Sequence, residues 1–102
     1  MDFEGDKVPS YELVFIVSPE VADEEVPNTV SKVSEFINRI GGSVTEVNQW
    51  GRRKLAYPIR RFIEGNYVLA QLELKPALTK ELEANLRLSE EVLRHLLIKL
   101  RD

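Results

Sequence analysis

The alternation of apolar and polar positions divides the chain into six predicted elements. Residues 11–18 (YELVFIVS) form a β-branched and aromatic run that stops at Pro19, which predicts a strand. A helix is predicted next, because apolar residues recur at spacings of four and three. These residues are Val26, Val30, Val33, Ile37 and Ile40. Asp23 is the expected N-cap of this helix, and Gly41 with Gly42 is its expected stop.

Two strands follow in the middle of the chain. β-Forming residues dominate residues 43–57 around Gly51, which predicts a long strand with a bulge at this glycine. Pro58 cannot donate a hydrogen bond to a neighbouring strand, so it marks an edge strand or the start of a connection. That connection is expected to run to Gly65 and Asn66, and a third strand is expected over residues 66–74.

A second helix and a last strand complete the pattern. Thr79 is the expected cap of the helix, and Leu82 and Leu86 give its apolar stripe. The strand over residues 92–100 is mostly apolar on both faces, so the pattern leaves its inward face open. The order strand, helix, strand, strand, helix, strand predicts an α+β, ferredoxin-like βαββαβ fold. In this fold two helices cover one face of a four-stranded antiparallel sheet.

Length and composition indicate one domain. The chain has 102 residues, enough for a single core, and we assign residues 1–9 to an acidic N-terminal tail and residues 10–102 to the domain. The absence of cysteine excludes disulfides and zinc-thiolate sites. The N-terminus lacks the features of a secretory signal, and no uncharged apolar run approaches the roughly 18 residues that span a bilayer. We therefore expect a cytoplasmic protein without a membrane partner.

The charge distribution is uneven. The chain has 14 Lys and Arg residues against 17 Asp and Glu residues, and five of the cations lie within residues 50–61 (WGRRKLAYPIRR), which contain no acid. The remaining nine cations therefore face all 17 acids. The five are Arg52, Arg53, Lys54, Arg60 and Arg61. A local cationic patch on an acidic body indicates a restricted contact with a phosphate-rich partner.

The residue types in this stretch suit a nucleic-acid backbone. Arginine binds phosphate through a planar fork, so a strand and its turn can follow a line of phosphates. Trp50 and Tyr57 offer flat surfaces for bases or for a protein partner. Arg94 in the last strand is a further candidate ligand of RNA. The alternative interpretation is a solvated hairpin whose aromatic residues belong to the core.

Candidate catalytic residues are sparse. His95, the only histidine, lies inside the last predicted strand, where a packing or solvent-exposed role is expected rather than that of a general base. The acids are scattered, so no metal site is predicted. The glycines at 41, 42 and 65 are isolated turn residues and do not form a phosphate-binding loop followed by a helix. We expect no enzymatic activity and no cofactor.

Three stretches of the sequence resemble the bacterial small-subunit ribosomal protein six family. They are residues 11–13 (YEL) with the apolar strand after them, residues 51–59 (GRRKLAYPI) and residues 65–67 (GNY). The resemblance covers about residues 10–100. It implies a ferredoxin-like domain on the ribosome that binds the central domain of small-subunit (16S) ribosomal RNA together with small-subunit ribosomal protein eighteen.

The resemblance also assigns residues by position. It implies that Arg52, Arg53 and Lys54 lie at or near the RNA-binding edge and that Arg94 matches a basic position in the last strand of the family. Charge alone assigns Arg60 and Arg61 to RNA. The flat surfaces of Trp50 and Tyr57 are assigned to the protein partner. The sequence departs from the family at Ser10, where a base is common, and at Asp102, beyond which many members extend towards the protein partner. These departures imply a missing RNA contact and a missing tail contact.

Two other classes share this order of elements. An RNA-recognition-motif type of single-strand binder stacks bases on aromatic residues of its central strands. Phe15 and Tyr67 match those positions, whereas Leu69 and Glu64 depart from the pattern. The other class is an oligomerising regulatory domain whose open apolar sheet face forms a dimer, whereas the ribosomal interpretation predicts a monomer when free.

Overall fold

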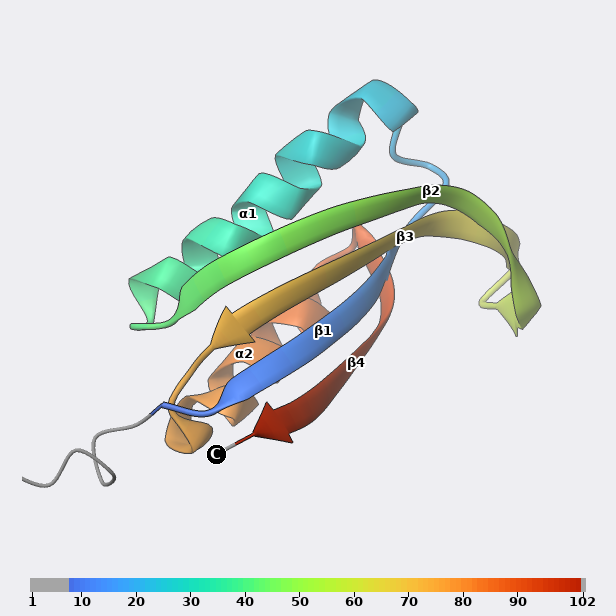
Figure 1. The fold of residues 1–102 in the computed structure, drawn as a ribbon. Helices are drawn as coiled ribbons and strands as arrows, with labels where there is room; N and C mark the ends of the chain where they lie inside the picture. The colour runs from blue at the N-terminus through green and yellow to red at the C-terminus, as the bar shows by residue number, and fades with distance from the viewer. Residues whose placement is uncertain (1–7, 102) are drawn as a thin grey trace, which may run out of the picture.

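The computed structural model describes residues 8–101 and has the predicted order of strands and helices, with a 3₁₀ helix before each α-helix. The elements are β1 (Ser10–Val17), η1 (Asp23–Glu25), α1 (Val26–Arg39), β2 (Ser43–Ile59), β3 (Phe62–Glu73), η2 (Pro76–Leu78), α2 (Thr79–Leu88) and β4 (Val92–Arg101). The strands form one antiparallel sheet in the order β2-β3-β1-β4, and both α-helices lie on the same face (Figure 1). The ferredoxin-like fold is confirmed.

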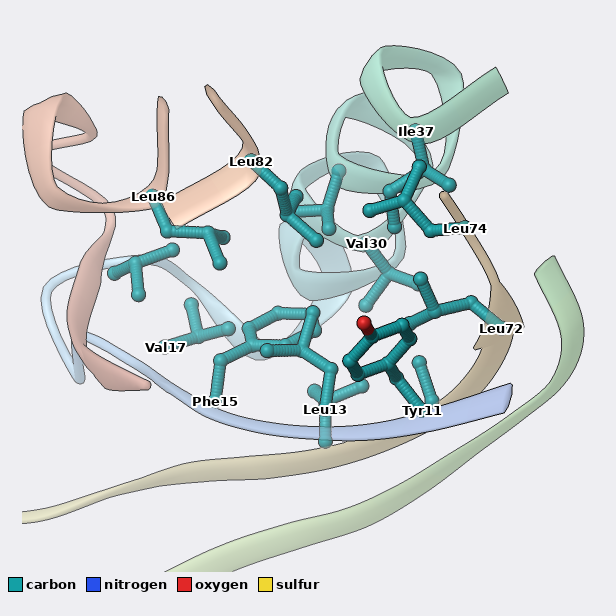
Figure 2. Packing of buried hydrophobic residues seen from close by; sticks show 14 of the residues in the cluster. Tyr11, Leu13, Phe15, Val17, Val30, Ile37, Leu72, Leu74, Leu82 and Leu86 are labelled. Carbon is teal, nitrogen blue, oxygen red and sulfur yellow. The ribbon is translucent and has the colours of Figure 1, made fainter. Parts of the chain in front are cut away.

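The core lies between this face of the sheet and the two helices. Because side chains alternate along β1, Leu13, Phe15 and Val17 point towards the helices. The apolar residues of α1 and α2 lie on the helix faces that pack against them (Figure 2). Leu13 and Phe15 are at most 1% exposed. Burying a side chain of this size stabilises the fold by roughly 1.5–3 kcal/mol. Val68 and Leu72 of β3 are equally buried, so the two central strands β1 and β3 together form the sheet side of the core.

Both predicted helix caps are wrong. Asp23 lies in η1, and the N-cap of α1 is Glu25, which makes no side-chain capping hydrogen bond. Thr79 is the first residue of α2, and its hydroxyl donates a hydrogen bond to the carbonyl of Pro76 at 2.9 Å. A 3₁₀ turn leads into each helix and moves the helix start away from the polar residue that the sequence singles out. The predicted stop at Gly41 is confirmed, since its φ is +103°.

The β2–β3 hairpin is longer than predicted. The bulge at Gly51 is confirmed by its φ of +87° and by a register shift between Gln49 and Gly51. The expected connection as far as residues 65–66 is wrong, because β3 begins at Phe62. Pro58 is tolerated because β2 is an edge strand and its pairing is irregular between Lys54 and Ile59.

The structure settles which face of β4 points inward. His95 and Leu97 pair with Phe15 and Leu13 and share their helix-covered face, so Arg94 and Leu96 lie on the open face. Strict alternation groups Val92 with Arg94, and this grouping is wrong. A register shift opposite the end of β1 turns Val92 into the core, where it is 3% exposed.

Gly65 is required by packing rather than by a turn. A Cβ atom at this position would lie 2.5 Å from Cγ2 of Ile16 and 3.0 Å from the carbonyl oxygen of Val17. We predict that Gly65→Ala lowers the free energy of unfolding by about 2–3 kcal/mol through overpacking. Gly51→Ala meets no atom within 4 Å and costs only its positive φ, about 1 kcal/mol. Urea denaturation measures both, and a Gly65→Ala variant as stable as wild type would contradict this packing.

Candidate nucleic-acid interface

The end of the β2–β3 hairpin, residues 52–64, carries all five clustered cations; we call it the distal hairpin. Figure 1 shows it curling away from the plane of the sheet at the right of the view. Its residues line a cavity of about 250 Å³ together with residues of β1 and β4 on the open face. The five cations therefore lie on a part of the hairpin that extends past the helix-covered part of the sheet.

Arg52 is held by acids from two other elements. Its guanidinium donates hydrogen bonds to Oδ1 of Asp23 at 2.8 Å and to Oε2 of Glu64 at 3.2 Å. The amide of Asn66 donates to the same oxygen of Asp23 at 3.4 Å. The hydrogen bonds from Arg52 and then Asn66 lower the pKa of Asp23, and the bond to Asp23 raises the pKa of Arg52. These contacts occupy both terminal nitrogens of Arg52.

Arg61 is also paired, although more loosely. It donates a hydrogen bond to Oε2 of Glu20 at 3.3 Å, and its guanidinium lies 5.0 Å from the ring centre of Phe62. Its side chain is 79% exposed. An exposed pair of this kind is weak, so Arg61 can exchange Glu20 for another anion.

Three cations of the distal hairpin have no acidic partner within residues 8–101. Arg53, Lys54 and Arg60 are exposed, and Arg53 lies over the ring of Trp50 at 5.3 Å. Arg60 is at the tip of the hairpin, where its φ is +60°. These three side chains are the cations most available to phosphate.

Arg94 joins β4 to the distal hairpin across the open face. Its guanidinium donates a hydrogen bond to the hydroxyl of Tyr57 and lies 5.8 Å from the centre of that ring. The cavity beneath is mainly apolar and is lined by Val14, Ile16, Leu55, Ile59, Tyr67 and Leu96, among others. Tyr57 and Trp50 are 57% and 46% exposed, so neither aromatic residue belongs to the core.

The structure thus divides the predicted site. Arg53, Lys54 and Arg60 gather on one hairpin, Arg52 and Arg61 are engaged by acids, and Arg94 supports the hairpin from the open face. Counting charges within residues 50–61 missed Glu20, Asp23 and Glu64. The acid-rich loop that precedes α1 was the available signal for these ion pairs, because its carboxylates attract nearby cations.

The only histidine of the chain, His95, lies beside a carboxylate of α2. His95 is paired with Glu83, with 2.9 Å between Nε2 and Oε1. Within residues 8–101, no three His, Cys, Asp or Glu side chains are grouped as metal ligands would be. Among these residues, no helix combines the length and apolar character needed to cross a membrane.

The ion pair of Asp23 with Arg52 predicts how the stability of the protein changes at acidic pH. The ordinary pKa of its carboxyl is 3.8, and the fold lowers this pKa, so the ion pair with Arg52 stabilises the protein above pH 3.8. This stabilisation is lost as the pH falls through the lower pKa of the folded state. We predict that Asp23→Asn lowers the urea midpoint slightly at pH 7 and that the difference shrinks as the pH is lowered below 3.8. A difference that stays the same over this whole pH range would contradict the ion pair.

Comparisons with known proteins agree with the fold and cover nearly the whole domain. The profile of the family described as ribosomal protein S6 matches residues 10–99. Small ribosomal subunit protein bS6 of Moorella thermoacetica is 39% identical over 93 residues, which are 91% of this chain and 95% of that protein. The protein of the same name from Dehalococcoides mccartyi is 42% identical over 90 residues, which are 88% of this chain and 83% of its own.

Solved structures give the same result. The crystal structure of 30S ribosomal protein S6 from Thermotoga maritima matches with a TM-score of 0.86 at 34% identity, covering 92% of this chain and 89% of that one. The solution structure of the C-terminal domain of the MgtC protein from Mycobacterium tuberculosis matches with a TM-score of 0.60 at 15% identity. The second likeness shows the fold alone.

Proposed function

The chain belongs to the ribosomal protein S6 family, and from that premise we propose that it is a structural, non-catalytic protein of the small ribosomal subunit. In this proposal it binds small-subunit (16S) ribosomal RNA together with small-subunit ribosomal protein eighteen. Its location is then the ribosome in the cytoplasm. The names of the relatives support the ribosomal role, and the residues of the distal hairpin support the RNA contact.

The observation that carries the RNA proposal is the group Arg53, Lys54 and Arg60. These exposed cations share one hairpin and have no acidic partner among residues 8–101, on a chain with a formal net charge of −3. An acidic protein can dock on RNA when a few cations lie together on the docking edge. Phosphate contacts position a protein without selecting sequence, so RNA shape and the protein partner supply the specificity.

The open face supports a protein contact beside the RNA contact. On β4 it carries Leu96 and Ile98, which pair with Val14 and Glu12 of β1 and are 57% and 41% exposed. Tyr57 overhangs the same face and lines the cavity next to Leu96. A contiguous exposed apolar surface of this kind is typical of a protein-binding site. We place the protein partner there, with Tyr57 and Trp50 at its border with the RNA.

The RNA-recognition-motif interpretation is disfavoured by the register of the central strands. Phe15 pairs with Val68 on the helix-covered face and is 1% exposed. Tyr67 pairs with Ile16 on the opposite face. The two aromatic residues therefore cannot present stacking surfaces side by side on one face of the sheet.

The oligomerising interpretation rests on the same apolar face of β4. It predicts a stable dimer without RNA, whereas the ribosomal proposal predicts a monomer that pairs with its partner. Light scattering over a range of concentrations separates the two. A constant dimeric mass would favour self-association and count against the monomer.

Binding to a defined RNA tests the proposed function. We would titrate a central-domain fragment of small-subunit ribosomal RNA with the protein, with and without small-subunit ribosomal protein eighteen. The proposal predicts tight binding that strengthens when the partner is present. Equally weak binding with and without the partner, at every salt concentration, would contradict it.

A further inference from the structure

Arg52 differs from the other cations of the distal hairpin in what surrounds it. Its side chain is 31% exposed and bridges Asp23 and Glu64, with both terminal nitrogens engaged. One arginine and two carboxylates together carry a charge of −1. A phosphate approaching Arg52 would have to displace these carboxylates or accept their repulsion. Arg52 is therefore a poor phosphate ligand in spite of its place in the cationic run.

The same contacts tie the hairpin to the body of the domain. Asp23 belongs to η1, directly before α1, while Glu64 and Asn66 belong to β3. Arg52 thus connects the start of the distal hairpin to the segment that leads into α1. Arg94 and Tyr57 make the corresponding connection on the open face. Together with the exposed pair of Arg61 and Glu20, these contacts connect the distal hairpin to the body of the domain.

The two residues that follow this anchor, Arg52, in the chain are candidate RNA ligands. Arg53 and Lys54 follow Arg52 directly in β2, and their strand pairs with Gly65 and Glu64 of β3. Fixing Arg52 fixes the backbone from which these two side chains project. Cations held in place before binding lose less conformational entropy when they meet phosphate.

We infer that Arg52 is a positioning residue of the RNA site and not a phosphate ligand. This inference rests on the proposed function of the distal hairpin. It reverses the role that charge and resemblance gave to Arg52 in the sequence. It also separates the positioning of the hairpin from direct phosphate binding, two effects that a simple alanine scan of the five cations would not distinguish.

The test combines salt-dependent RNA titration with amide hydrogen exchange of the protein alone. Four variants are compared with wild type: Arg52→Ala, the double variant Asp23→Asn with Arg52→Gln, Arg53→Ala and Arg39→Ala. The double variant removes the ion pair without changing net charge. Arg39→Ala removes one cation at the end of α1 remote from the hairpin and controls for charge alone.

A positioning role predicts a specific combination of results. Arg52→Ala and the double variant should bind RNA about two- to fivefold more weakly, the equivalent of an exposed ion-pair network, with the slope of log affinity against log salt unchanged. Amides of residues 52–64 should exchange faster in both variants. Arg53→Ala should instead lower the slope by roughly 0.7–0.9 and leave exchange unchanged. Arg39→Ala should change neither the slope nor exchange.

Other results would overturn the inference. A loss of slope in the charge-neutral double variant equal to that of Arg53→Ala would make Arg52 a phosphate ligand. Faster exchange with unchanged affinity would make the anchor structural only. Failure of the wild-type protein to bind the RNA at any salt concentration would instead refute the proposed function itself, so the two failures are distinguishable.

Discussion

Replacing Arg53, Lys54 and Arg60 together by alanine is expected to remove most of the affinity for ribosomal RNA. Each phosphate contact contributes roughly 0.7–0.9 to the slope of log affinity against log salt, so three lost contacts should lower the slope by roughly 2–3. At about 0.1 M salt this corresponds to an affinity loss on the order of a hundredfold or more. The three side chains are exposed and make no acidic contact among residues 8–101, so the fold should survive.

A second triple variant controls for charge. Arg39, Lys75 and Lys80 are also exposed, and replacing them by alanine changes the net charge equally while leaving the distal hairpin intact. We expect this control to keep nearly the wild-type slope. If both triple variants lost affinity and slope to the same extent, RNA would be sensing the overall charge of the protein rather than the hairpin.

Replacing Phe15 by alanine is expected to produce the largest loss of stability. Phe15 is 1% exposed, and it packs against the helices from the centre of the sheet (Figure 2). Truncating a buried phenylalanine costs about 3–5 kcal/mol, a large part of the roughly 5–15 kcal/mol that stabilises a domain. Urea denaturation measures the change. Leu96→Ala on the open face, where Leu96 is 57% exposed, should cost less than about 1 kcal/mol.

A milder variant keeps the Phe15 prediction testable if the alanine variant does not fold. Phe15→Leu should lower the free energy of unfolding by roughly 1–2 kcal/mol and leave RNA affinity unchanged. A Phe15 variant with wild-type stability and no RNA binding would contradict the core position. Such a result would support base stacking of the RNA-recognition-motif type.

The spacing of apolar residues was enough to predict the helices and the buried face of the first strand. The spacing of Val26, Val30, Val33 and Ile37 identified α1, and alternation in β1 identified its buried face. The failures came from context that a local pattern does not contain. Gly65 was interpreted as a turn residue, whereas its lack of a side chain makes room for Ile16 of a neighbouring strand. The start of β3 was misplaced for that reason.

The sequence predicted where the candidate site lies in the chain but not which side chains contact one another there. Charge along the chain located the distal hairpin and the sequence resemblance connected it with RNA. The contact between Arg52 and Asp23 joins residues 29 positions apart, and only the folded chain brings them together. The same holds for Arg94 and Tyr57, which are 37 positions apart. Sequence alone therefore assigned one role to cations that the fold divides into those with and those without an acidic partner among residues 8–101.

Site-specific crosslinking tests most directly whether the distal hairpin is the RNA-binding edge. The chain contains no cysteine, so a single introduced cysteine carries a unique photo-crosslinker. Ile63 of the distal hairpin is 60% exposed, and Ala77 of η2 is an exposed control at the opposite end of the sheet. With ribosomal RNA and the protein partner present, we predict crosslinks to RNA from Ile63→Cys and none from Ala77→Cys. Crosslinks from position 77 without any from position 63 would contradict the central claim.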